Sequence, residues 1–232
     1  GLTVSQKKSL FFRALLPMVL MTNREILADR ARLRGIRGDI AARRTVSPEN
    51  ADWVRDLARR YGLSSLATGS EPPNGRSLDL LLRRVDAIPP SLALAQAAVE
   101  SAYGSSRFAV EGNALFGQWR FGDGLVPGRQ RTRLGDYRIA DFDSPMGSIR
   151  AYARNLNTNP AYKPFRDRRA VARQGGRTPE GAVLAGGLLA YSEKGQQYVD
   201  LLRNVIARNR LSVLDMAKLA PSSTRRIVTG VL

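Results

Sequence analysis

Glu100 is the residue whose surroundings most favour acid–base chemistry. It lies in the last turn of a predicted helix that follows Pro89 and Pro90, with Ser91 as the expected N-cap. Burial would raise the pKa of a carboxyl here, and the negative end of the helix dipole acts in the same direction. A carboxyl with a raised pKa can serve as a proton donor at neutral pH.

An ordinary role for Glu100 is the alternative, because most helix carboxylates are solvated. In that case Glu100 would sit at a helix end, paired with Arg107. The composition of the helix favours a central position, since it consists largely of alanine and lets neighbouring backbone approach on nearly every side (Ala93, Ala95, Ala97, Ala98 and Ala102). A central helix would partly dehydrate Glu100.

The chain of 232 residues contains no His and no Cys. This excludes His and Cys nucleophiles, disulfides, and metal sites built on imidazole or thiolate. Acid or base chemistry must therefore come from Asp, Glu, Tyr, Lys or Arg. We expect neither a cofactor nor a metal.

The formal net charge is +17, and it comes mostly from Arg spread along the whole sequence. Such a surface attracts polyanions, which include nucleic acid, acidic wall polymers and anionic lipid headgroups. Arg-rich composition can equally reflect a GC-rich genome. The sequence has no aromatic-basic RNA motif and no helix-turn-helix pattern, so no specific nucleic-acid partner is expected.

Apolar periodicity and capping signals predict a mainly α protein. Helices are expected, in one or two pieces, over 7–35, and then over 48–61, 77–85, 92–103, 145–156, 161–173, 178–189 and 196–209, with a loop over 64–76. Residues 107–142 lack helical periodicity and alternate glycines with large apolar residues, which predicts two or three short strands. No segment is long and apolar enough to span a membrane.

A small β-containing lobe directly after a central helix that carries a carboxylate is the layout of lysozyme-like enzymes. The motif LAQAAVESAYGSSRF, followed by NALFGQW, resembles the signature of bacterial peptidoglycan glucosaminidases (glycoside hydrolase family 73 type). Three later stretches, GLVPGRQR, NLNTNPAYKPFRDRRA and GGLLAYSEKGQQYVDLL, resemble the Bax-like branch of that family. The similarity covers roughly residues 10–211.

The resemblance implies a lysozyme-like fold and an endo-β-N-acetylglucosaminidase that cleaves the β-1,4 bond after N-acetylglucosamine in peptidoglycan. Glu100 matches the general acid of the family, and Tyr191 matches a tyrosine that faces the acid and holds the reacting sugar or water. The substrate-binding residues that the resemblance implies are Phe116, Gln118, Trp119 and Tyr162.

The chain departs from many relatives at the second carboxylate, which they carry in the β-lobe. The corresponding segment, 129–135, holds none. Asp136, Glu111 or Asp123 could substitute, or one carboxylate could suffice with the 2-acetamido group of the substrate as nucleophile. Two other functions remain open: a lytic transglycosylase on the same fold, and a non-catalytic basic module that binds wall polymers or nucleic acid.

Three segments are expected: a helical N-terminal extension over 1–88 packed on the core, a catalytic domain over 89–210, and a loosely attached C-terminal extension over 211–232. The expected partners are peptidoglycan strands and acidic wall or membrane-surface polymers, and the protein is expected to be a monomer. The expected location is the periplasm, the cell envelope or the exterior. The sequence starts at Gly1 without an export signal, which says little about the compartment.

Overall fold

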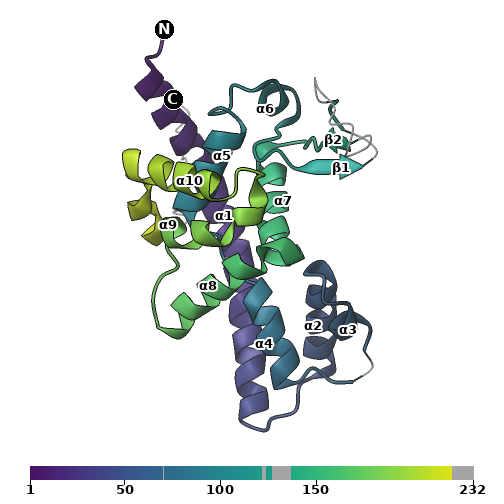
Figure 1. The fold of residues 1–232 in the computed structure, drawn as a ribbon. Helices are drawn as coiled ribbons and strands as arrows, with labels where there is room; N and C mark the ends of the chain where they lie inside the picture. The colour runs from purple at the N-terminus through teal and green to yellow at the C-terminus, as the bar shows by residue number, and fades with distance from the viewer. Residues whose placement is uncertain (70, 122–123, 127–136, 221–232) are drawn as a thin grey trace, which may run out of the picture.

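The computed structural model describes residues 1–69, 71–121, 124–126 and 137–220, with only the backbone for 119–121 and 137. Helices dominate the described chain (Figure 1). The longer elements are α1 (Val4–Ala41), α2 (Pro48–Arg60), α4 (Gly75–Arg84), α5 (Pro90–Glu100), α7 (Pro145–Thr158), α8 (Lys163–Gln174) and α10 (Gln196–Arg208). The shorter ones are α3 (Ser64–Thr68), α6 (Arg107–Gly112), α9 (Gly181–Leu184), β1 (Trp119–Phe121) and β2 (Tyr137–Ile139), with 3-10 turns at Pro160–Tyr162, Ala185–Gly187, Leu189–Tyr191 and Leu211–Met216.

Helix α1 is one continuous helix that runs the length of the molecule (Figure 1). Thr3 begins it with a capping box, and Pro17 is accommodated inside it. Its buried side includes Leu15, Val19 and Leu33, and the helix packs against α4, α5 and α7. The N-terminal region therefore shares one hydrophobic core with the predicted catalytic region.

Helices α2 to α4 form the lower part of the molecule in Figure 1. Helix α2 begins at Pro48 as predicted, and Ser47 is its N-cap. The predicted loop over 64–76 is only partly correct, because Ser64–Thr68 forms the short helix α3, which packs against α2. Asn74 then caps α4 by a reciprocal pair of hydrogen bonds with Ser77.

Helix α5 is the central helix of the fold, and every residue from Pro90 to Ala98 is buried. Ser91 is not its N-cap as predicted, since the helix begins at Pro90. The Ser91 backbone N–H and hydroxyl both donate to the carboxylate of Asp215, at 2.9 and 2.8 Å, as does the N–H of Gly181 at 2.9 Å. Residues 211–216 are thus bound to the core, and the expectation of loose attachment is wrong for them.

The lobe after α5 contains the helix α6 and two antiparallel strands. Trp119 pairs with Ile139 and Phe121 with Tyr137, and an isolated bridge joins Leu125 to Ile139. The lobe is therefore β-containing as predicted. The short helix α6 at its start was not expected. Together with the helical remainder, this confirms the predicted class: a mainly α, lysozyme-like fold with a small lobe after the central helix.

The predicted helix over 178–189 is wrong, because only the short helix α9 and two 3-10 turns form there. Gly187 lies so close to the backbone of Phe165 that a Cβ at this position would overlap it. Only glycine permits this approach, and the 3-10 turn Ala185–Gly187 packs closely against α8.

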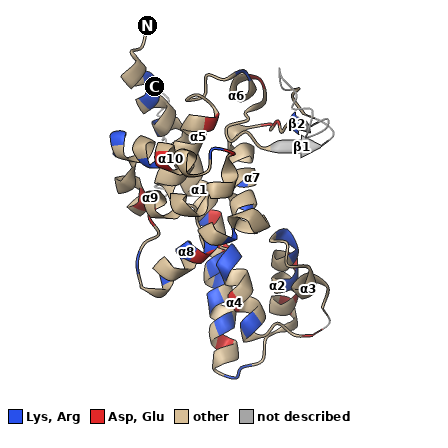
Figure 2. Ribbon diagram, in the orientation of Figure 1, with Lys and Arg blue, Asp and Glu red and all other residues tan. Residues whose placement is uncertain are grey.

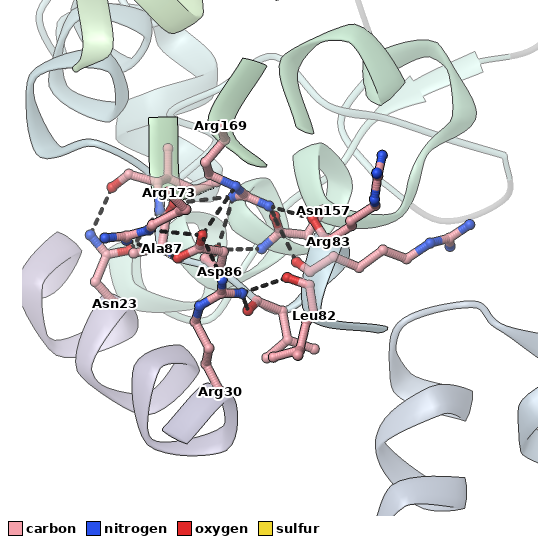
Figure 3. A network of polar contacts seen from close by, with 12 residues as sticks. Asn23, Arg30, Leu82, Arg83, Asp86, Ala87, Asn157, Arg169 and Arg173 are labelled. Carbon is pink, nitrogen blue, oxygen red and sulfur yellow. Dashed lines mark hydrogen bonds and ion pairs between the residues drawn. The ribbon is translucent and has the colours of Figure 1, made fainter. Parts of the chain in front are cut away.

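Asp86 lies between α4 and α5 and joins four helices (Figure 3). Arg173 donates to both of its carboxylate oxygens, at 3.1 and 2.9 Å, while Arg30 and Arg169 form ion pairs with it at 3.7 and 3.8 Å. Arg169 also donates to the backbone carbonyls of Asp86 and Ala87. This network, which we call the Asp86 joint, links α1 and α8 to the chain that enters the central helix.

The basic residues are distributed over the helices and not gathered in one segment (Figure 2). No helix in the described ranges combines the length and the apolar character needed to cross a membrane. Within the same ranges, no three or more Asp and Glu side chains cluster in a way that could hold a metal ion.

Candidate active site

Glu100, the last residue of α5, lines a groove at the end of this helix. This groove has a volume of about 1020 Å³ and is bounded by the start of the lobe, by one side of α7, and by the turn around Tyr191. Of the residues singled out in the sequence, it brings together Glu100, Phe116, Gln118, Tyr162 and Tyr191. An open groove of this size can accept an extended chain of sugars.

Glu100 is partly buried, and its Oε1 accepts a hydrogen bond of 2.7 Å from the hydroxyl of Tyr198. Burial raises the pKa of Glu100, and this effect outweighs the hydrogen bond from Tyr198, which lowers it. The predicted direction of the shift is confirmed. The alternative pairing with Arg107 is wrong, because Arg107 forms its ion pair with Glu111 at 3.2 Å.

Gly117 brings the backbone of the lobe close to the other carboxylate oxygen of Glu100. Its φ of +59° lies in the left-handed region that favours glycine, and a Cβ there would lie 3.3 Å from Oε2. A side chain at position 117 would therefore be strained and would crowd this oxygen. Glycine at position 117 therefore leaves space beside Oε2, and both Gly117 and Glu100 line the groove.

Two buried residues, Gln96 and Tyr152, extend the hydrogen bonding of Tyr198 into the core. Gln96 Nε2 donates to the hydroxyl of Tyr198 at 3.1 Å, and the hydroxyl of Tyr152 donates to Gln96 Oε1 at 2.7 Å. Sequence interpretation missed all three residues. Gln96 carried a detectable signal, since it is the one polar side chain between Leu92 and Val99 and lies one helical turn before Glu100.

Tyr191 lines the groove, but its hydroxyl donates to the carbonyl of Phe116 at 3.1 Å. Its ring stacks on that of Tyr198, with the centroids 5.5 Å apart and an interplanar angle of 3°. The ring of Tyr162 also contacts that of Tyr191, at a centroid distance of 5.6 Å and an interplanar angle of 32°. Tyr191 is thus held by ring contacts near Glu100, and Tyr198 is the tyrosine that bonds to the carboxylate.

The residues predicted to bind substrate differ in exposure. The ring of Phe116 is stacked on Tyr152 at 3.9 Å, and the residue is only 2% exposed, so it packs the floor of the groove and offers no open face to a sugar. Gln118 lines the groove, and its Oε1 is buried with no hydrogen-bond partner in the described structure. Trp119 pairs through its backbone in β1, and its side chain lies outside what is described.

The candidates for a second carboxylate do not gather at the described groove. Glu111 is exposed on α6, is bound to Arg107, and is not among the residues that line the groove. Asp123 and Asp136 lie outside the described residues. Sequence interpretation did not consider Glu193, an exposed carboxylate two residues after Tyr191, which does line the groove.

Among the described residues, three cationic side chains line the groove: Arg150, Arg154 and Lys194. Arg150 forms a two-pronged ion pair with Glu25 of α1, at 3.1 and 2.6 Å. The groove therefore combines a partly buried acid with basic groups that suit a substrate carrying negative charge.

Comparisons with known proteins show the family of the chain. Residues 80–211 match the family model described as "Glucosaminidase: Mannosyl-glycoprotein endo-beta-N-acetylglucosaminidase". The chain is 32% identical over 199 residues to "Protein bax" of Escherichia coli (strain K12), an alignment that covers 84% of this chain and 67% of that protein. No solved structure shows significant similarity to the chain. The chain belongs to the glucosaminidase family, in its Bax-like branch, and is a glycoside hydrolase of the endo-β-N-acetylglucosaminidase type.

Proposed function

We propose that the enzyme cleaves the β-1,4 bond on the reducing side of N-acetylglucosamine in peptidoglycan, with Glu100 as the general acid. The observation that carries this proposal is the position of Glu100: a partly buried carboxyl, with its pKa raised by burial, on a groove of about 1020 Å³. Action on peptidoglycan implies a place in the periplasm or cell envelope. The basic groups on the groove suit the carboxylates of muramic acid and its peptides.

The first half of the reaction breaks the glycosidic bond. Glu100 gives its proton to the bridging oxygen, which leaves as the hydroxyl of the next sugar. The carbonyl oxygen of the 2-acetamido group forms a bond to the anomeric carbon and yields a cyclic oxazolinium intermediate. In the second half, the Glu100 carboxylate removes a proton from water, and the resulting hydroxyl opens the ring at the anomeric carbon.

The aromatic cluster of Tyr162, Tyr191 and Tyr198 supports this route, because it presents Tyr191 on the groove while Tyr198 bonds to Glu100. We propose that Tyr191 positions the acetamido group or the water. Substrate assistance requires the N-acetyl group, so glycan that has been de-N-acetylated should resist cleavage by the enzyme.

Glu193 is the alternative second carboxylate, since it lines the same groove. Measuring turnover of Glu193→Gln separates the two routes. Retained cleavage together with resistance of the de-N-acetylated glycan supports substrate assistance. Loss of cleavage with normal folding would assign Glu193 to the attack on the anomeric carbon or to the activation of water.

The role of Glu100 is tested by the release of soluble fragments from purified peptidoglycan. Glu100→Gln keeps the size of the side chain and removes the proton donor, so we expect a loss of activity of roughly a thousandfold. Asp56→Asn is a matched control at an exposed carboxylate of α2. Near-normal activity of Glu100→Gln would remove Glu100 from the mechanism.

A further inference from the structure

Three buried polar side chains connect α5, α7 and α10 behind the groove. Gln96 is 0% exposed, Tyr152 is 1% and Tyr198 is 3%. Polar groups in a protein interior destabilise it unless they are hydrogen-bonded, and these three bond to one another and then to Glu100. We call Tyr152, Gln96 and Tyr198 the relay.

All the hydrogen bonds of the relay are donated in one direction, from Tyr152 toward Glu100. The hydroxyl of Tyr152 donates to Gln96 Oε1, which turns the amide so that Nε2 faces Tyr198. Because the oxygen of Tyr198 accepts from that amide, its single proton points toward Glu100 Oε1, 2.7 Å away. Burial and the charge of Glu100 raise the pKa of Tyr198, so it remains a hydroxyl and a donor.

The two oxygens of Glu100 therefore have different surroundings. Oε1 accepts from the relay, and Oε2 lies beside Gly117, where the absence of a side chain leaves it room. A protonated carboxyl has one carbonyl oxygen and one hydroxyl oxygen, and the carbonyl oxygen is the better hydrogen-bond acceptor. Because Oε1 accepts from Tyr198, the form with the carbonyl at Oε1 and the proton on Oε2 is favoured.

We propose that Tyr152, Gln96 and Tyr198 are positioning residues that keep Oε1 as an acceptor and so assign the transferable proton of Glu100 to Oε2. This inference rests on the proposed role of Glu100 as the general acid. The relay does not move a proton along its length. It determines which oxygen of Glu100 carries the proton that is transferred. The hydrogen bond from Tyr198 also stabilises the carboxylate that remains after the transfer.

Tyr198→Phe is the most direct test, because it keeps the ring that stacks on Tyr191 and removes the hydroxyl. The Glu100 carboxyl is followed by carbon-13 NMR titration, and kcat and KM are measured across pH. We expect the pKa of Glu100 to rise, and the basic limb of the kcat profile to move to higher pH with it. We also expect kcat to fall roughly tenfold, the value of a hydrogen bond to a charged group, with KM nearly unchanged.

Gln96 variants test the direction of the relay. Gln96→Met keeps the volume but cannot orient Tyr198, so the titration should shift in the same direction as in Tyr198→Phe. Gln96→Glu can accept from Tyr152 and, when protonated, donate to Tyr198. It should therefore restore kcat at low pH and lose it as the pH rises, a pattern that a purely structural role does not produce.

Tyr61→Phe is the matched control, since Tyr61 is a tyrosine on the C-cap of α2 that is 9% exposed and takes no part in the relay. Its titration and pH profile should match those of the wild type. The proposal is overturned if Tyr198→Phe and Gln96→Met leave the Glu100 titration unchanged, or if Tyr61→Phe shifts it equally. Because the titration does not depend on turnover, an active Glu100→Gln would refute the proposed function without affecting this result.

Discussion

At the scale of the residue, burying Glu100 lowers the stability of the folded protein at neutral pH, because burial disfavours the charged carboxylate. Burial raises the pKa of its carboxyl, so the folded protein binds this proton more tightly than the unfolded chain does. A group of this kind contributes most at low pH. Its contribution to stability falls as the pH rises from the unfolded pKa, about 4.3 for Glu, through the raised folded value.

Glu100→Gln should therefore stabilise the protein at neutral pH. The neutral amide avoids the dehydration of the charge and can still accept from Tyr198. We expect Tm to rise by roughly 2–4 °C at pH 7 and to change little at pH 4. Calorimetry at both values checks this, with Asp56→Asn for comparison. A gain of the same size at both pH values would contradict the account.

The sequence allowed part of the site to be predicted. Glu100 could be found because it ends an alanine-rich helix that the prolines and Gly104 delimit, and those signals are local. Tyr198 could not be identified as its partner, because it lies 98 residues further on and its position in α10 reads as an ordinary core position. Which of Tyr191 and Tyr198 bonds to Glu100 depends on how α10 packs against α5. The local sequence pattern carries no information about this packing.

At the scale of the element, the Asp86 joint fixes the chain that enters the central helix. Burial alone would raise the pKa of Asp86, but Arg169, the hydrogen-bonded Arg173 and Arg30 together lower it. Burial also lowers the pKa of Arg169 to about 10, with Asp86 opposing the shift. The pair therefore remains ionised at neutral pH within the core.

Asp86→Ala should be strongly destabilising, because it leaves Arg169, whose side chain is 1% exposed, without a counter-charge. The expected loss is about 3–5 kcal/mol of unfolding free energy, measured with urea at pH 7. Since the pKa of Asp86 is lowered on folding, this loss should shrink as the pH falls from the unfolded value, about 3.9, through the lower folded value.

Asp56→Ala breaks an exposed ion pair with Arg59 in α2 and is the control for that experiment. It should cost no more than about 0.5–1 kcal/mol. Equal effects of the two substitutions would show that burial of the Asp86 joint contributes nothing.

Prediction of the elements succeeded where a helix buries a periodic stripe and failed where tertiary contacts decide. Capping signals placed the starts of α2 and α7 correctly, at Pro48 and Pro145. The predicted helix over 178–189 is replaced by α9 and 3-10 turns, and the close packing of Gly187 on Phe165 is a tertiary contact that the local pattern does not show. Ser91 reads as an N-cap locally, but its hydroxyl bonds to Asp215, a long-range partner.

At the scale of the whole molecule, the N-terminal helix and the family domain share one core. The family match begins at residue 80, inside α4, whereas α1 packs against α5 and α7 within the matched region. We propose that residues 1–88 form a structural collar and that the catalytic domain at 89–210 depends on it. The buried side of α1, which includes Leu15, Val19 and Leu33, supports this proposal.

Leu33→Ala tests this dependence in the full chain. Leu33 is completely buried on α1, so the substitution should lower the unfolding free energy by about 2–5 kcal/mol. If the two regions form one cooperative unit, urea unfolding followed by circular dichroism and by loss of activity should give the same midpoint, lowered equally in the variant. Leu10→Ala, at a position 59% exposed, should have little effect. Separate midpoints for the two signals would show that the collar unfolds independently.

The products of peptidoglycan digestion test the central claim most directly. Wild-type and Glu100→Gln protein are incubated with purified peptidoglycan, and the fragments are reduced with borohydride and identified by mass spectrometry. The account predicts fragments from the wild type that end in reduced N-acetylglucosamine, and almost none from Glu100→Gln. Fragments that end in 1,6-anhydromuramic acid, or equal release by the variant, would contradict it.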